Sequence, residues 1–391
     1  MNLTMPKQIG DYNKNQMLSI LRERGPTSRV ELSRILEISP TSVTRNTATL
    51  LELGIVRECG SDKSNMGRKP VLVELCSDFC YVLGADIVGG TLKVALADLM
   101  GKIVKYYEEP INRAGGAHGV LEQMLKALVN IITETGINKE KIWVATIGTP
   151  GIFNPNTGKS QFSFFMDKWE DIDIRLSVFE ALSIETLIEN DVNLDVIGES
   201  WKGVGKDYEN ILYVKLGQGL AARIVLNEKL LRGEHNMAGE IGYMLSGKPY
   251  DSSVMAGESR LLNYEHLLSN AAVCRRYREL TGESTVNTIS DLLVLAEKGD
   301  EAALGLIRNL LDQFAVVLLN SATVVDPNVI ILGGDACCFG EKEIGVLKQR
   351  IEHYFPLVQN IIPSKLNKQA CLYGAIKMGL DRVEERITDI W

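Results

Sequence analysis

The stretch YVLGADIVGGTLKVALADLMGKIVKYYEE, residues 81–109, decides the fold, because three β-rich runs follow one another across a glycine turn and a tight turn. The same order returns in NILYVKLGQGLAARIVLNEKLLRG, residues 210–233. The matching turns, at Gly90 and Gly219, are separated by roughly one domain length. Each copy is followed by helical periodicity. This duplication predicts two similar α/β lobes that face a cleft.

Length and composition are typical of a globular protein with two or three domains: 391 residues, 45% hydrophobic and 24% charged. The N-terminus has no apolar stretch after its charges, and the most apolar later run, at 314–325, is shorter than a bilayer span. We therefore expect a cytoplasmic protein without membrane contact. Seven cysteines form no CxxC pair, which indicates neither a disulfide framework nor a metal site.

Charge is distributed unevenly along the chain, whose net charge is -8. Residues 1–80 contain 11 Lys+Arg and 9 Asp+Glu, whereas the remainder contains 31 Lys+Arg and 41 Asp+Glu. A mildly basic N-terminal part on an acidic body favours a polyanion partner for the N-terminal part alone.

Two short helices are expected first. One runs from about Lys14 to Arg24 and ends at Gly25. Ser28 and Glu31 form a capping-box pattern, so a second helix begins at Arg29. The residues expected to face the core are Met17, Ile20 and Leu21 in the first helix and Val30, Ile35 and Leu36 in the second.

A third helix is expected after a short turn, because Ser39 is a good N-cap and Pro40 suits the first helical position. This spacing is that of a helix-turn-helix. Val43, Leu50 and Leu51 can face the core, which leaves an outward face with small donors and one guanidinium, suited to a major groove. The predicted DNA-binding residues on this helix are Thr41, Ser42, Thr44 and Arg45.

A β-wing is expected next, from a strand at 55–58, a polar loop at 59–70 and a return strand at 71–75. Arg68 and Lys69 lie at its tip and could enter a minor groove or hold the backbone. A solvated helix face, or a winged helix that contacts protein, is the alternative. Helix and wing together favour DNA binding.

The motifs IGTPGIFNPNTG, ENDVNLDVIGE, LLRGEHNMAGEIGY and VIILGGD carry a resemblance. The body resembles the ROK family of sugar kinases and sugar-responsive repressors, and the N-terminal part resembles the winged helix that the family's repressors add. The resemblance implies an α/β protein: a winged helix-turn-helix plus an actin-like, ribonuclease H-like, two-lobed body. It places the winged-helix domain, here called the head, at residues 1–79 and the body at residues 80–391. Lobe 1 is expected at about 80–190 plus 372–391 and lobe 2 at about 191–371.

The nucleotide turns depart from the family's pattern. Aligned without a gap, Val88 and Gly89 fall on the family's two glycines and Gly90 on its threonine. The second turn reads GQGLAAR at 217–223, so a threonine and two glycines are missing, and Arg223 would crowd the cleft unless it pointed away. A phosphate cradle needs bare backbone. We therefore expect no ATP and no turnover, although a shifted register or Arg223 as phosphate ligand remains an alternative.

The sugar pocket is partly retained. The resemblance makes Asp191 the catalytic base if the chain is a kinase, and Asn190 its neighbour on the sugar. Without a phosphate acceptor, the same pair can still bind a hydroxyl. The alternative is that Asp191 simply caps the following helix. The predicted sugar-binding residues are Asn190, Asp191, Glu240, Tyr243 and Asn263.

Other family features are missing. Tyr243 replaces the family's zinc-binding His, the loop that follows has no Cys, and Asn263 lies near the position of a sugar-binding Glu. We therefore expect neither zinc nor another cofactor. A sugar-contacting Asn is also absent near 164–166, where Phe and Met give a more apolar pocket wall.

These features predict a repressor of carbohydrate-utilisation genes that lacks kinase activity. A homodimer or tetramer would bind double-stranded operator DNA, and a small sugar, such as xylose or a derivative, would change the lobe angle. One alternative is an ATP-dependent ROK sugar kinase with a fused DNA-binding head. Another is a constitutive regulator whose body only dimerises.

Overall fold

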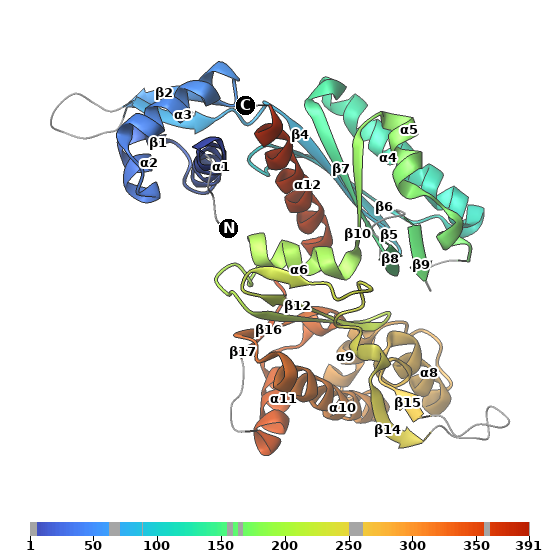
Figure 1. The fold of residues 1–391 in the computed structure, drawn as a ribbon. Helices are drawn as coiled ribbons and strands as arrows, with labels where there is room; N and C mark the ends of the chain where they lie inside the picture. Colours follow the sequence, from blue (N-terminus) through green and yellow to red (C-terminus); the bar gives the residue numbers. More distant parts are fainter. Residues whose placement is uncertain are drawn as a thin grey trace.

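The computed structural model describes residues 6–61, 71–87, 89–154, 159–162, 167–249, 261–355 and 360–390. It shows an N-terminal head beside a body with two five-stranded sheets (Figure 1). Both sheets have the same strand order, so the expected duplication and the predicted α/β class with a winged head are confirmed.

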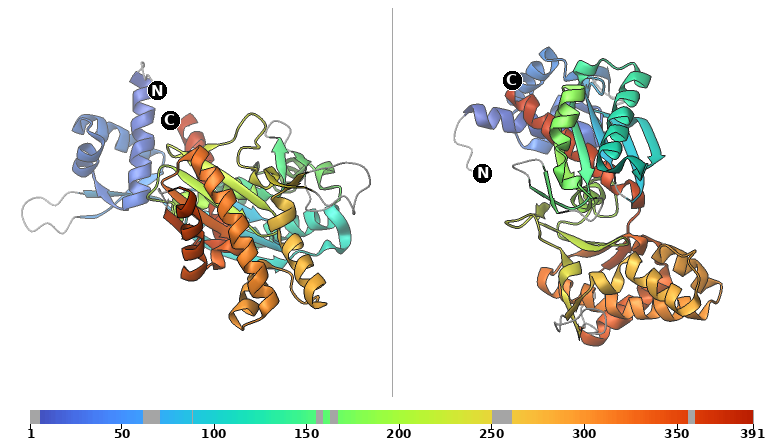
Figure 2. Two further views of the ribbon diagram at one scale, coloured as in Figure 1. Left: turned by 90° about the horizontal axis from the view of Figure 1, so that it is seen from below. Right: turned by 90° about the vertical axis from the view of Figure 1, so that its right-hand side faces the viewer.

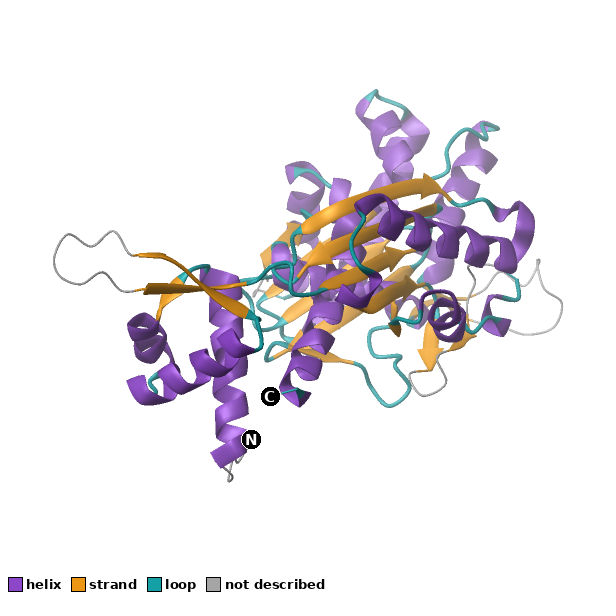
Figure 3. Ribbon diagram, turned by 90° about the horizontal axis from the view of Figure 1, so that it is seen from above, coloured by secondary structure: helices purple, strands orange, loops and turns teal. Residues whose placement is uncertain are grey.

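The head consists of three helices and a three-stranded sheet of order β1-β3-β2, which lies to one side of the body (Figure 3). Its elements are α1 (Pro6–Arg24), β1 (Thr27–Ser28), α2 (Arg29–Leu36), α3 (Pro40–Glu52), β2 (Val56–Ser61) and β3 (Val71–Leu75). The capping residues act as expected: Ser28 accepts from the Glu31 amide, and Ser39 accepts from the Ser42 amide. The first helix begins earlier than the sequence predicted.

One core prediction in the head is wrong. Val30 is 74% exposed, whereas Leu32 is the buried residue of α2. The helix is only two turns long, and its buried stripe passes through Leu32, Ile35 and Leu36, which leaves Val30 on the opposite side. Met17, Ile20, Leu21, Val43 and Leu50 are buried as predicted.

Lobe 1 is a sheet of order β10-β7-β4-β5-β6, in which the two hairpin partners β5 and β6 are antiparallel and β4, β7 and β10 are parallel. Its elements are β4 (Tyr81–Asp86), β5 (Thr91–Asp98), β6 (Ile103–Pro110), α4 (Gly116–Thr135), β7 (Ile142–Thr149), α5 (Ile174–Leu182) and β10 (Glu185–Asn190). A two-stranded ribbon, β8 (Ile152–Asn154) with β9 (Lys159–Phe162), follows β7. The apolar faces of α4 and α5 cover one side of the sheet.

Lobe 2 repeats this order, which reads β17-β16-β11-β12-β13 from the equivalent edge. Its helices cover the outer side of the sheet. Its strands are β11 (Ile211–Leu216), β12 (Leu220–Leu226), β13 (Lys229–Leu231), β16 (Val329–Gly334) and β17 (Asn360–Pro363), with a ribbon of β14 (Leu245–Pro249) and β15 (Leu261–Asn263). Its helices are α7 (Glu265–Leu268), α8 (Asn270–Thr281), α9 (Ile289–Glu297), α10 (Glu301–Val325) and α11 (Glu341–Tyr354). Short 3-10 turns are η1 (Arg113–Gly115), η2 (Lys139–Lys141), η3 (Trp169–Asp171), η4 (Ile241–Tyr243), η5 (Asp335–Cys338) and η6 (Asn367–Gln369).

The helix α10 is, within the described residues, the one long and apolar enough to cross a bilayer by length and composition. Phe314, Leu318 and Ala322 of this helix are buried in the core that α10 forms with β11 and β16. Its apolar character is therefore explained by the packing of lobe 2.

Two helices lie between the sheets, α6 (Asp191–Lys202) and α12 (Ala370–Asp389). Figure 1 shows α12 against lobe 1 and α6 against lobe 2. Val192 and Val196 of α6 pack on β11 and β16, whereas Leu194 packs on Cys371 and Ala375 of α12. The lobes therefore meet through two helices in direct contact. The exact lobe boundaries stay a prediction.

The head and lobe 1 share one hydrophobic core. Met17 and Leu21 of α1 belong to the same buried cluster as Ile376 and Val383 of α12. Asn15 and Thr388 exchange hydrogen bonds at 3.1 and 3.2 Å. Both views in Figure 2 place α1 near the C-terminal end of α12. The head is thus fixed to the helix that closes lobe 1.

Candidate functional site

The outward face of α3 carries the predicted DNA-binding side chains. Thr41, Thr44 and Arg45 are exposed and Ser42 is half-buried. Thr44 donates to the Pro40 carbonyl at 2.9 Å, so its hydroxyl is held in one orientation. These side chains lie on the solvent-facing side of α3, and their contact with DNA stays a prediction.

Arg45 differs from three other arginines of the head. Arg29, Arg34 and Arg57 are paired with carboxylates at 2.7 to 2.8 Å. Within the described residues, Arg45 has no such partner. Its guanidinium is therefore available to a phosphate or a base edge. The other predicted cations, Arg68 and Lys69, lie outside the described residues.

The second site begins where β10 ends and α6 starts. Asn190 is the N-cap of α6, and its Oδ1 accepts from the amides of Val192 and Asn193 at 3.0 and 3.2 Å. The alternative role for Asp191 as the cap is therefore wrong, because Asp191 is the first helical residue. Asn190 also donates to the Gly151 carbonyl at 2.9 Å. The cap fixes both residues at the lobe junction.

Asp191 is ion-paired with a lysine of the lobe 2 sheet. Lys215 Nζ on β11 lies 2.8 Å from Asp191 Oδ2 and 2.7 Å from Asp195 Oδ2. Burial lowers the pKa of Lys215, but Asp191 and Asp195 outweigh that effect and hold it well above its usual value. Burial raises the pKa of Asp195 to about 6. Neither Lys215 nor Asp195 was predicted as a site residue, although both lie on regular elements facing the junction.

Arg223 contacts two of the residues predicted to bind sugar. Its Nη2 donates to Asn190 Oδ1 at 3.0 Å and to Glu240 Oε1 at 2.8 Å, and Nη1 donates to the Ala222 carbonyl at 2.5 Å. The side chain is 3% exposed. Of the two orientations that the sequence left open for Arg223, the structure has the one that points away from the nucleotide cleft: β12 directs the side chain toward Asn190 and Glu240.

Tyr243 and Asn263 lie on the lobe 2 side of the junction. Tyr243, in η4, is 47% exposed, and its pKa is raised by burial and by the nearby Glu240 and Glu265. Asn263 accepts from the His266 amide at 3.1 Å, at the start of α7. The structure brings Glu240, Tyr243 and Glu265 together, and Asn263 bonds locally. Glu265, two residues after Asn263, is a residue that the sequence analysis missed.

Glu265 closes the second glycine turn from within the protein. Its Oε2 accepts from the Leu220 amide at 2.8 Å, and burial raises its pKa, an effect that this hydrogen bond opposes. A Cβ on Gly219 would lie 3.0 Å from its Oε1. The adjacent Gly217 faces the carboxylate of Asp335, and its carbonyl accepts from the Asn270 amide at 2.7 Å. One amide of the turn therefore already has an acceptor, and two carboxylates lie beside the turn, an arrangement that disfavours an anion such as a phosphate.

The first glycine turn keeps two glycines with left-handed backbone, Gly89 at φ 70 and Gly90 at φ 83. Val88 lies outside the described residues, as do the residues at 164–166 and at 250–260. At the end of β4, Asp86 is buried, and burial raises its pKa against the opposing charge of Lys93, whose Nζ lies 3.3 Å away. Lys93 also donates to the Lys368 carbonyl.

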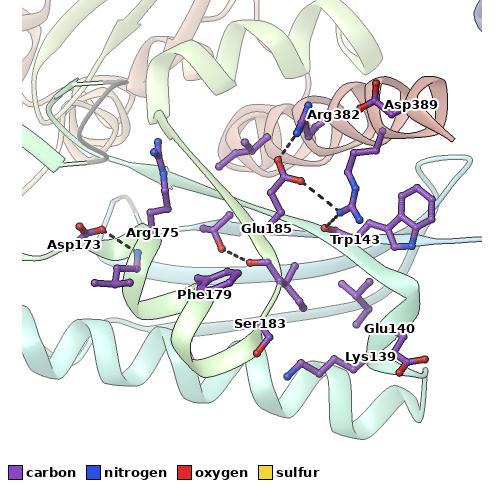
Figure 4. Close-up of a pocket in the computed structure, with 16 residues that line it drawn as sticks. Lys139, Glu140, Trp143, Asp173, Arg175, Phe179, Ser183, Glu185, Arg382 and Asp389 are labelled. Carbon is purple, nitrogen blue, oxygen red and sulfur yellow. Dashed lines mark hydrogen bonds and ion pairs between the residues drawn. The ribbon is translucent and has the colours of Figure 1, made fainter.

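Two cavities lie near lobe 1. The smaller, about 250 Å³, is next to the predicted sugar site and is lined by Gly151, Arg175, Leu187, Ile188, Glu189, Asn190, Asn193, Arg232, Asn236 and Met378. The larger, about 1210 Å³, lies beyond the edge strand β10, between α5 and the end of α12 (Figure 4). There Glu185 pairs with Arg382 at 2.6 Å, and Phe179 is 52% exposed. Only the smaller cavity touches residues predicted to bind sugar.

Comparison with known proteins agrees with this architecture. The ROK family model matches residues 82–382, and a winged helix-turn-helix DNA-binding model matches residues 11–57. A xylose repressor of Caldicellulosiruptor bescii is 27% identical over 96% of both chains. A glucokinase of Halalkalibacterium halodurans is 27% identical over 71% of this chain and 87% of its own.

Among solved structures, a ROK family transcriptional regulator described as a homologue of the E. coli MLC protein has a TM-score of 0.78. It is 20% identical and the match covers 97% of this chain and 98% of that one. That likeness shows the shared fold of head and body together. The family model spans more than half of the residues, and the chain therefore belongs to the ROK family.

Proposed function

We propose that this chain is a DNA-binding transcriptional repressor of carbohydrate-utilisation genes, controlled by a small sugar such as xylose or a derivative. The observation that carries the proposal is one continuous molecule in which a winged head shares its core with a sugar-kinase-like body. Relatives named xylose repressor match over nearly their full length, head included. The protein acts in the cytoplasm as a homodimer, or a tetramer, on a palindromic operator.

A route for sugar control follows from three packed helices. Asn190 and Asp191 stand at the N-terminus of α6, α6 packs on α12, and α12 packs on α1 of the head. A ligand that binds one lobe arrangement better than the other shifts the position of α12 and hence of the head. In a dimer, this changes the spacing of the two recognition helices.

The protein performs no phosphoryl transfer. Lys215 ion-pairs with Asp191, the carboxylate that would have to accept the sugar's proton. Glu265 and Asp335 place negative charge at the second glycine turn, where a triphosphate would bring more. Both arrangements support sensing in place of catalysis.

The test is a mobility-shift assay with the full-length protein on DNA fragments upstream of its own gene and of neighbouring genes, in about 0.15 M salt, where nonspecific binding is weak. We expect preference for one of these fragments over random DNA of equal length, and a change in affinity on adding a sugar. Equal affinity for all fragments would contradict the proposal.

A second candidate is an ATP-dependent sugar kinase with a fused DNA-binding head, which the retained Asp191 favours. ADP release with hexoses, pentoses and amino sugars separates the two functions. We expect none above the background of the Asp191→Asn variant. Turnover that Asp191→Asn abolishes would establish the kinase instead.

A further inference from the structure

Arg223 is a buried cation within the candidate sugar site. Its guanidinium holds Asn190 and Glu240, two of the five residues predicted to contact sugar hydroxyls. In the resembling kinases, the last position of the second glycine turn is a glycine, and Arg223 stands there in this chain. A neutral sugar has no charged group that could pair with a guanidinium beside Asn190 and Glu240.

The two partners of this ion pair differ in freedom. Arg223 lies in the middle of β12, paired with Tyr213 of β11, and its side chain is 3% exposed. Glu240 is 19% exposed and follows Gly239, whose φ of 90 marks a turn. Glu240 can rotate toward solvent, whereas Arg223 is held in the sheet. Any ligand of this site must therefore tolerate the positive charge of Arg223 at a fixed position.

A neutral ligand meets a charge penalty here. To use Asn190 or Glu240 as hydroxyl acceptors, it must take them from Arg223, and a buried charge that loses its partner is strongly unfavourable. A ligand with a carboxylate or phosphate group replaces the Glu240 carboxylate and keeps the guanidinium paired. The site thus discriminates by ligand charge.

The adjacent cavity has matching chemistry. It has a volume of about 250 Å³, below the usual range for drug-sized ligands and suited to a small one. Asn190 lines this cavity and its Oδ1 accepts from Arg223, so the guanidinium lies one hydrogen bond behind the cavity wall and is not itself part of the lining. Arg175, Asn193, Arg232 and Asn236 also line it. One acid faces it: Glu189, which pairs with Arg232 at 2.5 Å.

We propose that Arg223 makes this protein select an acidic monosaccharide, one carrying a carboxylate or phosphate group, over the neutral sugar of the same skeleton. The acidic group accepts hydrogen bonds from Arg223 in place of Glu240, while Asn190 keeps its bond to Arg223, and Asn193 Oδ1 and the Asn236 side chain bind the hydroxyls. This inference rests on the proposed function and names the ligand class of the same site.

Isothermal titration of the full-length protein tests the selectivity with matched ligands: glucose, glucuronate and glucose 6-phosphate, and xylose with xylonate. We expect at least one acidic ligand to bind 10-fold or more tightly than its neutral partner. Arg223→Gly, which restores the family's glycine, is expected to reduce that ratio at least 10-fold. Glu240→Gln removes the competing carboxylate and is expected to tighten binding of the acidic ligand. Arg275→Ala, an exposed arginine on α8, is the control and leaves the ratio unchanged.

The same titrations can overturn the inference. A neutral sugar that binds at least as tightly as its acidic partners, or a ratio that neither variant changes, contradicts it while the repressor function stands. If Arg223→Gly fails to fold, Glu240→Gln decides the question alone. Absence of binding by every sugar contradicts both this inference and the sugar response, whereas a lack of operator preference in mobility shifts contradicts the repressor function by itself.

Discussion

Gly374 of α12 lies against the carbonyl of Leu194 of α6, and a Cβ at this glycine would come within 1.9 Å of that oxygen. One turn away, a Cβ on Gly198 of α6 would meet the Ala370 carbonyl at 2.2 Å. The two helices between the lobes are thus in backbone contact at both points. Because the two helix backbones are in contact, α6 cannot move toward α12 without displacing it.

Gly374→Ala is predicted to separate these helices and to destabilise the protein by about 1 to 3 kcal/mol, the usual cost of overpacking. The clash is with backbone, which cannot turn aside as a side chain can. Urea unfolding measures the change. The control is Gly305→Ala on α10, where a Cβ meets nothing within 4 Å and helix propensity improves by about 0.5 to 1 kcal/mol. Equal effects of the two changes would contradict the packing argument.

The Arg22 variant tests the attachment of the head. Arg22 of α1 donates to the Leu99 carbonyl at 3.1 Å and to the Glu384 carboxylate of α12. We expect Arg22→Ala to cost about 1.5 to 3 kcal/mol, the range for hydrogen bonds to charged groups, and to weaken the effect of sugar on DNA binding. Arg350→Ala, in the exposed pair with Asp312, should cost less than about 1 kcal/mol.

Thermal unfolding and sugar titrations of operator affinity measure the two effects. A double-mutant cycle with Glu384→Ala isolates the pair. If sugar shifts operator affinity in Arg22→Ala as strongly as in the unaltered protein, this ion pair has no part in the coupling.

DNA contact by α3 is tested with Arg45→Ala. Because Arg45 is exposed and makes no ion pair among the described residues, we expect no change in stability but weaker operator binding. If Arg45 contacts one phosphate, the slope of log affinity against log salt should fall by about 1. Arg34→Ala, whose guanidinium is already paired with Glu31, is the control. Unchanged affinity and slope would remove Arg45 from the interface.

Stability is predicted to depend on the ionisation of Asp195. Its folded pKa of about 6 exceeds the ordinary value of 3.8, so between pH 4 and 6 the folded state binds more protons than the unfolded state. The free energy of unfolding therefore falls through this window as pH rises, by up to about 3 kcal/mol for this group. Asp195→Asn should remove that contribution.

Urea unfolding at several pH values between 4 and 8 gives the comparison. The stability of Asp195→Asn relative to the unaltered protein should rise between pH 4 and 6 and stay constant above. An exposed carboxylate, in Asp312→Asn, should give no such trend. Parallel curves for Asp195→Asn and the unaltered protein would show that Lys215 compensates the buried charge fully.

Much of the fold could be predicted from local signals. Ser28 and Ser39 mark helix starts because their side chains satisfy amides next to them in sequence, and such contacts do not depend on the rest of the molecule. The two glycine turns reveal the duplication because tight turns need particular residues. Val30 shows the limit: a two-turn helix has too few residues to define its buried side.

The sequence by itself determined the winged head, the two repeated lobes and the positions of Asn190, Asp191 and Glu240 in the family's motifs. Only the tertiary structure decided what those side chains contact. Lys215 reaches Asp191, Arg223 reaches Asn190 and Glu265 reaches the Leu220 amide from distant parts of the chain. These pairings depend on how the lobes and α6 pack, and packing geometry is not encoded in the spacing of any single motif.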